Sequence, residues 1–341
     1  MNVIDQKTDA TIGKGKYDAG RKAAQVGATS TAKLFGLAGG ASLSAGSGIG
    51  AAVDVQTYNG HTYAGIADGA SLKNASSVTV NADSKEHLTS VAATLAGGAG
   101  TFAGAGAAGA HSVSTDTKAY LGQSEVTEAG DVSATAKDET ELKTVAGSGA
   151  ASGNTGVGLT AAVEVVNKKA SAIVGDDVKV TGSSLTVKAE NTSSSVTSAA
   201  GLGAGGTAGL AGAASETFMK QETDAHVGKN AKVTVKKGAA GSVGAAGTVG
   251  MGLTNSTVSF TGDTAAYADE NAVIDGGEKV NISATQLTKV DYGTVAGAVG
   301  GTASLSGTVG VNALKTTTKA YAAASSRRDS KRRRDRGHGQ R

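Results

Sequence analysis

The chain has 341 residues and a formal net charge of +3, with 52 Gly and no Pro, Cys or Trp. The absence of cysteine excludes a disulfide framework, a thiol nucleophile and a zinc–thiolate site. Aromatic residues make up only 3% of the chain, so we expect a thin core of Val, Ala, Leu and Ile. Such a core suits a fold whose layers contact only their neighbours better than it suits a compact enzyme. The low net charge favours folding over disorder.

Residues 1–28 precede the repeated part of the chain and form a lead segment that either stands alone or belongs to an earlier repeat. The start, Met1-Asn2-Val3-Ile4-Asp5, lacks the basic region and apolar stretch of a signal peptide. We find no apolar stretch long enough for a membrane-spanning helix. If the protein is exported, we expect its targeting signal outside this chain.

Residues 29–326 contain about five repeats of roughly 54 residues, which we treat as one domain. A first marker is a small residue followed by a bulky one. It occurs at Thr62-Tyr63, Ala119-Tyr120, Ala172-Ile173, Ala225-His226, Ala266-Tyr267 and Ala320-Tyr321. Glycine follows most of these pairs, at Gly65, Gly122, Gly175 and Gly228.

Two further markers keep a fixed order with the first. One is Gly or Asn followed by Thr, at Gly100-Thr101, Asn154-Thr155, Gly206-Thr207, Gly247-Thr248 and Gly301-Thr302. The other is an alternating segment, at Val78–Ala82, Val132–Ala136, Leu185–Ala189 and Val280–Ala284. The unit between His226 and Tyr267 is shorter than the others and has no clear copy of this segment. We call it the short unit.

Each repeat is predicted to form β-strands. In residues 157–165, the larger apolar side chains share one parity and Gly, Thr, Ala and Glu share the other. This period of two is typical of a strand with one buried face. Glycine pairs such as Gly97-Gly98 and Gly205-Gly206 mark turns. The many Gly and β-branched residues disfavour helices.

These features predict an all-β fold, most simply an elongated, repetitive β-solenoid of the parallel β-helix type. One unit would form either two coils of ordinary size or one wide coil. The runner-up is a long-stranded antiparallel meander that folds at the Gly-rich turns. The sequence does not decide between these two architectures.

The repeat resembles those of large repetitive bacterial surface adhesins, the filamentous-haemagglutinin-like and leukotoxin-like proteins of type V secretion. The resemblance rests on the block Asn167–Gly175, on Val178, Val180 and the segment Leu185–Ala189, and on a second partial copy at Lys315–Tyr321. It extends over about residues 30–325 and implies a stalk that projects from the cell surface.

Few residues suggest chemistry. The five histidines, His61, His87, His111, His226 and His338, show no metal-type spacing. Asp176-Asp177 is interpreted as a solvated turn because the tandem Gly-Gly-x-Gly-x-Asp pattern of calcium repeats is missing. The glycines of 97–102 and 203–209 lack the Gly-Lys-Ser/Thr ending of a phosphate loop. We therefore predict no catalytic residue, no cofactor and no metal site.

Two other segments suggest a function. Thr316-Thr317-Thr318 suggests an ice-binding face, but the hydroxyls are out of register in other repeats, which have Ser114-Thr115-Asp116, Lys168-Lys169 and Gln221-Glu222-Thr223. Residues 327–341 form a basic, low-complexity tail that holds seven of the eight arginines and carries +8 and −2. A basic segment can bind nucleic acid, yet its foreign composition favours a truncated or frame-shifted gene end. No nucleic-acid partner is expected.

The sequence thus predicts a non-enzymatic structural or adhesive stalk at the cell surface, outside the cell. Its expected partner is a protein or glycan on a host or neighbouring cell, with no small-molecule substrate. Self-association through exposed solenoid ends is also expected. The alternatives are a carbohydrate-active β-helix, either lectin or polysaccharide-degrading enzyme, and a self-assembling amyloid-like matrix protein.

Overall fold

The computed structural model describes residues 1–234, 237–252, 255–275, 279–294, 299–300, 303–305, 309–323 and 327–329. Within these residues the regular elements are all β-strands, and they form two sheets. Sheet A contains β1 (Asn2–Ile12), β4 (Gly48–Ile66), β7 (Phe102–Leu121), β9 (Thr155–Val174), β11 (Ala208–Val227), β14 (Asn255–Ala268), β18 (Ala303–Leu305) and β19 (Val309–Ala322).

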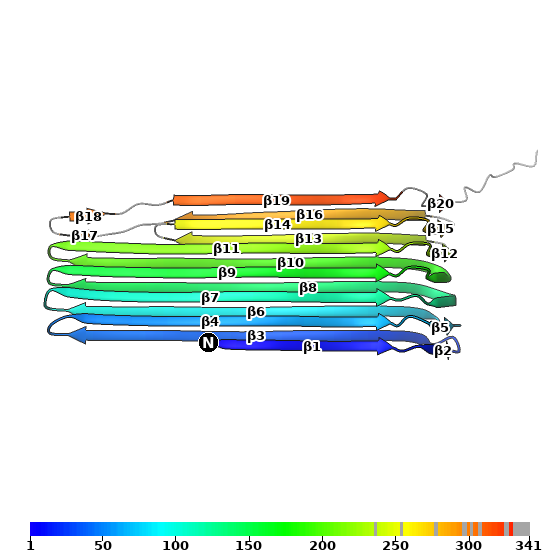
Figure 1. Ribbon diagram of the computed structural model, residues 1–341, viewed down its shortest axis with the longest axis horizontal. Coiled ribbons are helices and arrows are strands. Elements are labelled where there is room, and N and C mark those ends of the chain that lie inside the picture. Colours follow the sequence, from blue (N-terminus) through cyan, green and yellow to red (C-terminus); the bar gives the residue numbers. More distant parts are fainter. Residues whose placement is uncertain are drawn as a thin grey trace, which may run out of the picture.

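Sheet B lies against sheet A and consists of long strands with short companions at one end (Figure 1). Its strands are β2 (Gly15–Asp18), β3 (Ala23–Ser44), β5 (Ala70–Lys73), β6 (Ser77–Gly98), β8 (Glu125–Ser152), β10 (Lys179–Gly205), β12 (Lys232–Thr234), β13 (Lys237–Gly252), β15 (Val273–Asp275), β16 (Lys279–Thr294), β17 (Val299–Gly300) and β20 (Arg327–Asp329).

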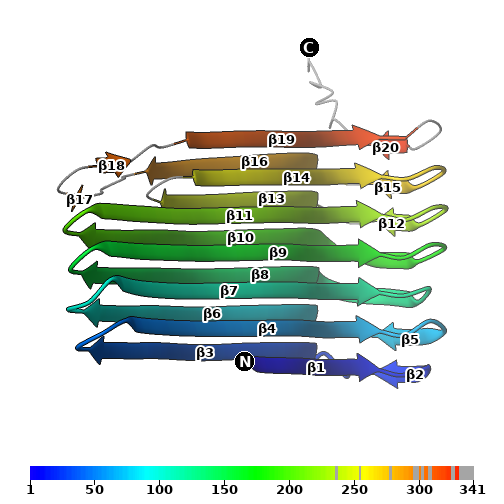
Figure 2. The same cartoon turned by 60° about the vertical axis from the view of Figure 1, so that its left-hand side comes forward.

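Each repeat contributes one long strand to each sheet. The chain runs along sheet B, turns, and returns along sheet A, as β3 and β4 show in Figure 2. Neighbouring strands of a sheet come from successive repeats and pair in parallel, for example β4 with β7 and β6 with β8. The antiparallel meander is therefore wrong, because its neighbouring strands would run in opposite directions.

The pairing register equals the repeat length. Asn2 pairs with Gln56 and Ala23 with Ser77, so the offset between partners is the same in both sheets (56 − 2 = 54 and 77 − 23 = 54). One unit therefore makes a single pass through both sheets. The strands follow the longest axis of the molecule (Figure 1). At about 3.3 Å per residue a strand of β6 length spans about 70 Å, whereas seven strands stacked at about 4.8 Å span only about 30 Å.

The register corrects the first marker in one repeat. Tyr120, Ile173, His226, Tyr267 and Tyr321 occupy equivalent positions in β7, β9, β11, β14 and β19.

In β4, however, the residue that pairs with Tyr120 is Gly65, whereas Tyr63 pairs with Lys118. The ring of Tyr63 lies over Gly65, where a Cβ would collide with it. A tyrosine two residues earlier thus covers the glycine, which explains why the sequence alignment was shifted.

Two copies of the second marker were also placed wrongly. The first is Asn154-Thr155, because Thr155 pairs with Phe102 and with Ala208, the residues that follow Thr101 and Thr207. Gly247 pairs with Ser194 inside sheet B and is not at a turn. Thr302 lies outside the described residues.

The alternating segments at 78–82, 132–136 and 185–189 are in register, as predicted. A further copy, at 238–242, fills the same position in the short unit, although no Val or Leu marks it.

The short unit lacks residues at the turn end of both sheets. β13 pairs with β10 only as far as Ala199, and β14 begins opposite Ala214 of β11. The next repeat fills the vacant positions, because its β17 pairs with the end of β10 and its β18 with the start of β11. The short unit is therefore accommodated without breaking the stack of strands.

Both ends of the chain join the two sheets. β1 and β2 pair with β4 and β5, so residues 2–18 occupy the position of a first repeat. β20 pairs with β15, which places Arg327–Asp329 beside Val273–Asp275. Residues 330–341, which hold most of the basic tail, lie outside the described residues.

The interior changes in width along the strands. At the end near β12 it is filled by Val, Leu, Ile and Ala, including Ile66, Leu121, Val126 and Val174. A second apolar layer stacks Tyr58, Val113, Val166, Met219 and Phe260 of sheet A in register. Toward the turns that link β3 to β4 and β6 to β7, the buried apolar side chains are alanines.

The alanine-rich end buries the face that hydrophobic alternation would leave exposed. Leu159 of β9 is 57% exposed and Val165 is 37% exposed, while Ala162 and Glu164 on the other parity are fully buried. The two sheets approach so closely here that a Cβ on Gly158 would collide with the carbonyl oxygen of Leu202 in sheet B. Only Gly, Ala and other small residues fit between the sheets, so the larger side chains point outward.

Candidate interaction surface

The outer face of sheet A carries a column of partly exposed side chains near the ends of its strands. Tyr120, Ile173, His226, Tyr267 and Tyr321 follow one another across five strands. The rings of His226 and Tyr267 stack with centroids 4.8 Å apart, and those of Tyr267 and Tyr321 with centroids 5.0 Å apart. Parallel strands in register are about 4.8 Å apart, so identical positions stack face to face.

Charged groups border this aromatic column. The Nζ of Lys118 lies 4.6 Å from the centroid of the Tyr120 ring, a cation–π contact. His226 Nδ1 lies 2.8 Å from Asp224 Oδ2. Burial, with a smaller contribution from Asp224, raises the pKa of Tyr267 far above its usual value. The phenol therefore stays neutral and can donate a hydrogen bond to a ligand.

A column of alternating charge lies beside the rings. His61 Nδ1 lies 3.7 Å from Asp116 Oδ2, and its Nε2 lies 3.9 Å from Asp9 Oδ1. Lys169 Nζ lies 2.8 Å from Glu222 Oε1, and this hydrogen bond raises the pKa of Lys169. Exposed ion pairs of this kind contribute only about 0–1 kcal/mol to stability. Their charges remain available to a partner.

A shallow hollow of about 400 Å³ opens on the outer face where β1, β4 and β7 meet. Donors and acceptors both line it: Asp5, Gln6, Lys7, Asn59, Gly60, His61, Ser114 and Asp116. Asn59 Nδ2 donates to Asp5 Oδ1 at 2.6 Å, which fixes two of these side chains. A wall of mixed carboxylate, amide, imidazole and hydroxyl groups matches the hydroxyls of a sugar or a polar peptide.

The interior holds a first buried polar cluster around Lys168. Lys168 Nζ lies 2.6 Å from Asp138 Oδ1 and donates to the backbone oxygen of Thr192 at 2.9 Å. The nearby Glu86 accepts hydrogen bonds from Ser84 and Thr140. Burial first, and then the charge of Asp138, raise the pKa of Glu86 to about 7. One ammonium thus lies near two carboxyl groups, and the raised pKa favours the protonated form of Glu86.

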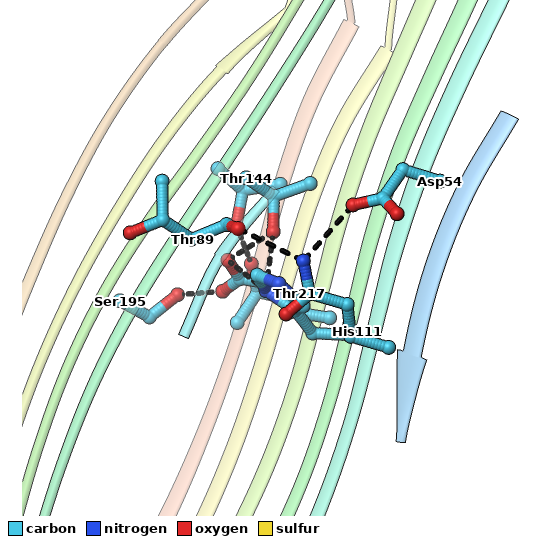
Figure 3. Close-up of polar contacts among 9 residues, drawn as sticks. Asp54, Thr89, His111, Thr144, Ser195 and Thr217 are labelled. Atoms are coloured by element: carbon cyan, nitrogen blue, oxygen red, sulfur yellow. Dashed lines mark hydrogen bonds and ion pairs between the residues drawn. The ribbon is translucent and has the colours of Figure 1, made fainter. Parts of the chain in front are cut away.

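A second buried polar cluster brings together His111, Thr144 and Ser195 (Figure 3). Glu164 lies between Thr144 and Ser195. Thr144 Oγ1 donates to Glu164 Oε1 at 2.6 Å and lies 2.9 Å from His111 Nδ1, while Ser195 donates to Glu164 Oε2. Since the Thr144 proton goes to Glu164, the geometry assigns the proton of the other hydrogen bond to His111 Nδ1.

Gln56 extends this cluster. It donates to Asp54 Oδ2 at 3.0 Å and to the Thr89 backbone oxygen at 2.8 Å. The members come from both sheets and from successive repeats.

Both polar clusters are enclosed between the sheets, with Glu86, Asp138 and Glu164 fully buried. They resemble a triad in composition, but no substrate can reach them in this structure. Their physical effect is to fix the position of one sheet against the other, because each buried polar atom needs its particular partner. The surfaces open to a ligand are the outer faces.

The residues that suggested chemistry lie far apart. Of the described histidines, His61, His87 and His226 lie on outer faces and His111 is buried, while His338 lies outside the described residues. His87 Nδ1 is 3.0 Å from Glu141 Oε2. Within the described residues, no group of three His, Asp or Glu side chains could hold a metal ion.

The turn at Asp176-Asp177 contacts the next repeat. Asp176 Oδ1 accepts the backbone N–H of Lys229 at 2.8 Å, as Asp68 Oδ1 accepts that of Gln123 at 2.7 Å. A Cβ on Gly228 would lie 2.5 Å from Asp176 Oδ1. This contact gives the glycine after the bulky residue a structural reason.

The Gly-rich segments at 97–102 and 203–209 are the turns from β6 to β7 and from β10 to β11. Thr318 of β19 belongs to a column that contains Thr264, Thr223, Thr117 and Thr62. The other four threonines are buried. The threonine register is therefore mainly internal, and sequence reasoning missed it because one member, Ala170, breaks the pattern.

No known protein family, curated protein or solved structure matches this chain. Among the described residues, no helix is long and apolar enough to cross a membrane.

Proposed function

We propose that the chain is a non-catalytic segment of an exported bacterial surface adhesin, built as a β-solenoid that presents a repetitive outer face. The column of stacked rings on sheet A carries this proposal. Aromatic side chains flanked by charges are typical of interaction hot spots, because they bury large areas at low entropic cost. The mixed polar hollow beside β1, β4 and β7 adds a second contact region.

The solenoid follows from the chain path as an interpretation. Successive long strands alternate between the two sheets, and each pairs in parallel with its equivalent in the preceding repeat. The strands of one repeat thus provide the edges on which the strands of the next repeat pair. An assembly of this kind grows by one strand spacing per repeat, so it suits a protein built from many copies of one unit.

The wide coil changes what such a segment does well. About 54 residues advance the stack by only about 4.8 Å, which is little reach for so long a chain. Each repeat does, however, add a strand roughly 20 residues long to each outer face. We propose a broad surface, and not length, as the functional product. Its partner is a protein or glycan on a host or neighbouring cell.

Enzymatic alternatives have less support. A polysaccharide-degrading enzyme needs two carboxyl groups open to a groove, whereas Glu86, Asp138 and Glu164 are enclosed between the sheets. A lectin-like contact with glycans is compatible with the adhesin proposal, since both use the outer face.

The test is binding of the full chain to glycan arrays, epithelial cells and bacterial cells. Tyr120→Ala and Tyr267→Ala remove rings from the column, and Thr186→Ala on the outer face of sheet B is the matched control. We expect the tyrosine variants to bind about tenfold more weakly or less and the control to bind as the unaltered chain does. If the full chain binds none of these surfaces, the adhesin proposal is refuted. Equal binding by all variants would refute the role of the column.

A further inference from the structure

The charged residues of this chain avoid one part of every repeat. Six long segments contain no Asp, Glu, Lys, Arg or His: 34–53, 88–110, 144–163, 191–215, 238–262 and 292–314. The first four span the end of a sheet B strand, the turn, and the start of the next sheet A strand. These four segments therefore lie at the same end of both sheets, where β3 turns into β4 and β6 into β7 (Figure 2). We call this part of the molecule the uncharged half.

Large apolar side chains cover the outside of the uncharged half on both faces. On sheet B, Phe35, Leu37, Leu43, Leu95 and Leu202 are 67%, 68%, 85%, 64% and 59% exposed. On sheet A, Ile49, Val53, Leu159 and Leu210 are 72%, 64%, 57% and 47% exposed. A shallow groove of about 410 Å³ with small residues on its floor, among them Ala93, Gly147 and Ala200, runs between the sheet B side chains.

The outer faces of these strands lack the charged residues that the other half of the same sheet presents to solvent. Parallel strands covered on both sides are apolar throughout, whereas strands with one solvated face alternate with charge. The charged half of β6 follows the second pattern, with Asp83, Lys85 and His87 pointing outward. The uncharged half of the same strand instead places Val91, Ala93 and Leu95 outward, while Ser90 and Thr94 point inward. Its outer face is therefore the more apolar of the two and is suited to a contact that removes it from water.

The exposed area is large enough to form a specific interface. Ten residues at about 3.3 Å, across four strands about 4.8 Å apart, give about 600 Å² on sheet B. Soluble monomers rarely expose an apolar patch of more than a few hundred Å². Two such faces in contact would remove about 1,200 Å² from water, the lower bound of stable, specific interfaces.

A second sheet of the same kind fits this face. The inner faces of the uncharged half, lined by residues such as Ala92, Ala107 and Ala146, already pack sheet against sheet with small side chains. The outer face is also smooth, because leucines lean over glycines of the next repeat. Leu95 Cδ2 lies 3.0 Å from the place of a Cβ on Gly149. A flat face without charge is complementary to itself, and pairing it desolvates no ion.

We propose that two copies of this chain associate face to face through the uncharged half of sheet B. The contact surface is formed by β3, β6, β8 and β10, with Leu95 on the inner strand β6 and Leu202 in the same row on β10. The similar outer face of sheet A lies on the opposite side of the molecule. Contacts through both faces would therefore stack solenoids into layered arrays. This contact is independent of the adhesive role and differs from association through the terminal strands.

The first experiment measures the association state of the full chain by sedimentation velocity over a concentration series. We expect dimers and larger species. The variant L95K/L202K places two ammonium groups in the contact and is expected to sediment as a monomer. The matched control is Thr186→Lys, an exposed position of the same face of sheet B in the charged half. It should associate as the unaltered chain does. Circular dichroism confirms that each variant keeps its strands.

A second experiment needs no destabilising charge. Because the chain has no cysteine, a single introduced thiol reports contact between copies. Ala93→Cys, on the groove floor, should form an intermolecular disulfide under mild oxidation. Thr186→Cys, in the charged half of the same face, should not.

Three results would overturn the proposal. The unaltered chain could remain monomeric throughout the series. L95K/L202K could associate as strongly as the control, which would move the contact to the strand ends. The chain could instead bind phosphatidylcholine vesicles through the same leucines without self-associating, which would make lipid the occupant.

Discussion

Replacing Glu86 by Gln separates the cost of burying a carboxylate from the rest of the fold. The side chain of Glu86 is fully enclosed between the sheets beside Asp138 and Lys168. Burial and the Asp138 charge raise its pKa from 4.5 to about 7 in the folded protein. Glutamine has the same shape as the protonated acid and never ionises. The variant therefore removes the titration and leaves most of the packing unchanged.

The magnitude follows from the shift. A rise from 4.5 to about 7 is about 2.5 pKa units (7 − 4.5), which corresponds to about 3 kcal/mol at 1.36 kcal/mol per unit. Because the folded-state pKa is raised, the stabilising contribution is complete below about pH 4.5 and disappears as the pH rises through 7. From pH 4 to pH 8, Glu86 thus lowers the unfolding free energy by up to about 3 kcal/mol.

Chemical denaturation at several pH values, followed by circular dichroism, measures this difference. The stability of Glu86→Gln relative to the unaltered chain should increase by up to about 3 kcal/mol between pH 4 and pH 8. A fixed loss of about 1 kcal/mol at all pH values is expected, since the amide nitrogen cannot accept the hydrogen bond of Ser84 or Thr140.

The control is Glu141→Gln on the outer face. A hydrogen bond from Lys143 lowers the pKa of Glu141, so its ionised form is favoured in the folded state. This variant should therefore lose a little stability as the pH rises above the carboxyl range, with the opposite sign. If the stability of Glu86→Gln keeps a constant offset from that of the unaltered chain at every pH, the pKa of Glu86 is the same in the folded and unfolded states and burial does not raise it.

Three further tests address the close packing of the sheets, a strained backbone position and a buried ion pair. Gly158→Ala should lower stability by about 2 kcal/mol or more in thermal unfolding, because its Cβ would collide with sheet B. The control Gly106→Ala has nothing within 4 Å of its Cβ and should change stability by less than about 1 kcal/mol. Equal losses in the two variants would contradict the close approach of the sheets. Glu128 has a φ of +54° at a bulge in β8, so Glu128→Gly should raise the free energy of unfolding in urea by about 1 kcal/mol; a decrease would show that its side chain matters more than its backbone. Asp138→Asn removes the carboxylate that pairs with Lys168 at 2.6 Å and should cost up to about 3–5 kcal/mol in urea unfolding. A neutral effect would mean that Glu86 replaces Asp138 as the counter-charge of Lys168.

Several features of the fold could be predicted from the sequence. The repeat length follows from recurring residues, and the pairing of Asn2 with Gln56 confirms it (56 − 2 = 54). The alternation in residues 157–165 correctly predicts a strand, because only a strand places every second side chain on one face. The all-β class follows from the same observations.

The candidate interaction surface could be predicted only in part. The column of Tyr120, Ile173, His226 and Tyr267 appears in the sequence as a recurring bulky residue. Its stacking depends on parallel pairing in register, which repetition suggests but does not prove. The column of charge beside it has no repeated residue type, so no sequence signal marks it.

Other features were decided by the tertiary structure alone. Alternation shows that the two faces of β9 differ, but it does not show which face is inside. The sequence favours the parity of Leu159 as buried, yet the structure buries Gly158 and Glu164 instead. The reason is the distance between the sheets. Where backbones approach closely enough for a Cβ to collide with a facing carbonyl, size excludes leucine from the interior. Glu164 lies nearer the middle of β9, beside the layer that holds Val166, where the interior has room for its side chain. Thr144 and Ser195 of the facing sheet donate the hydrogen bonds that its carboxylate needs there.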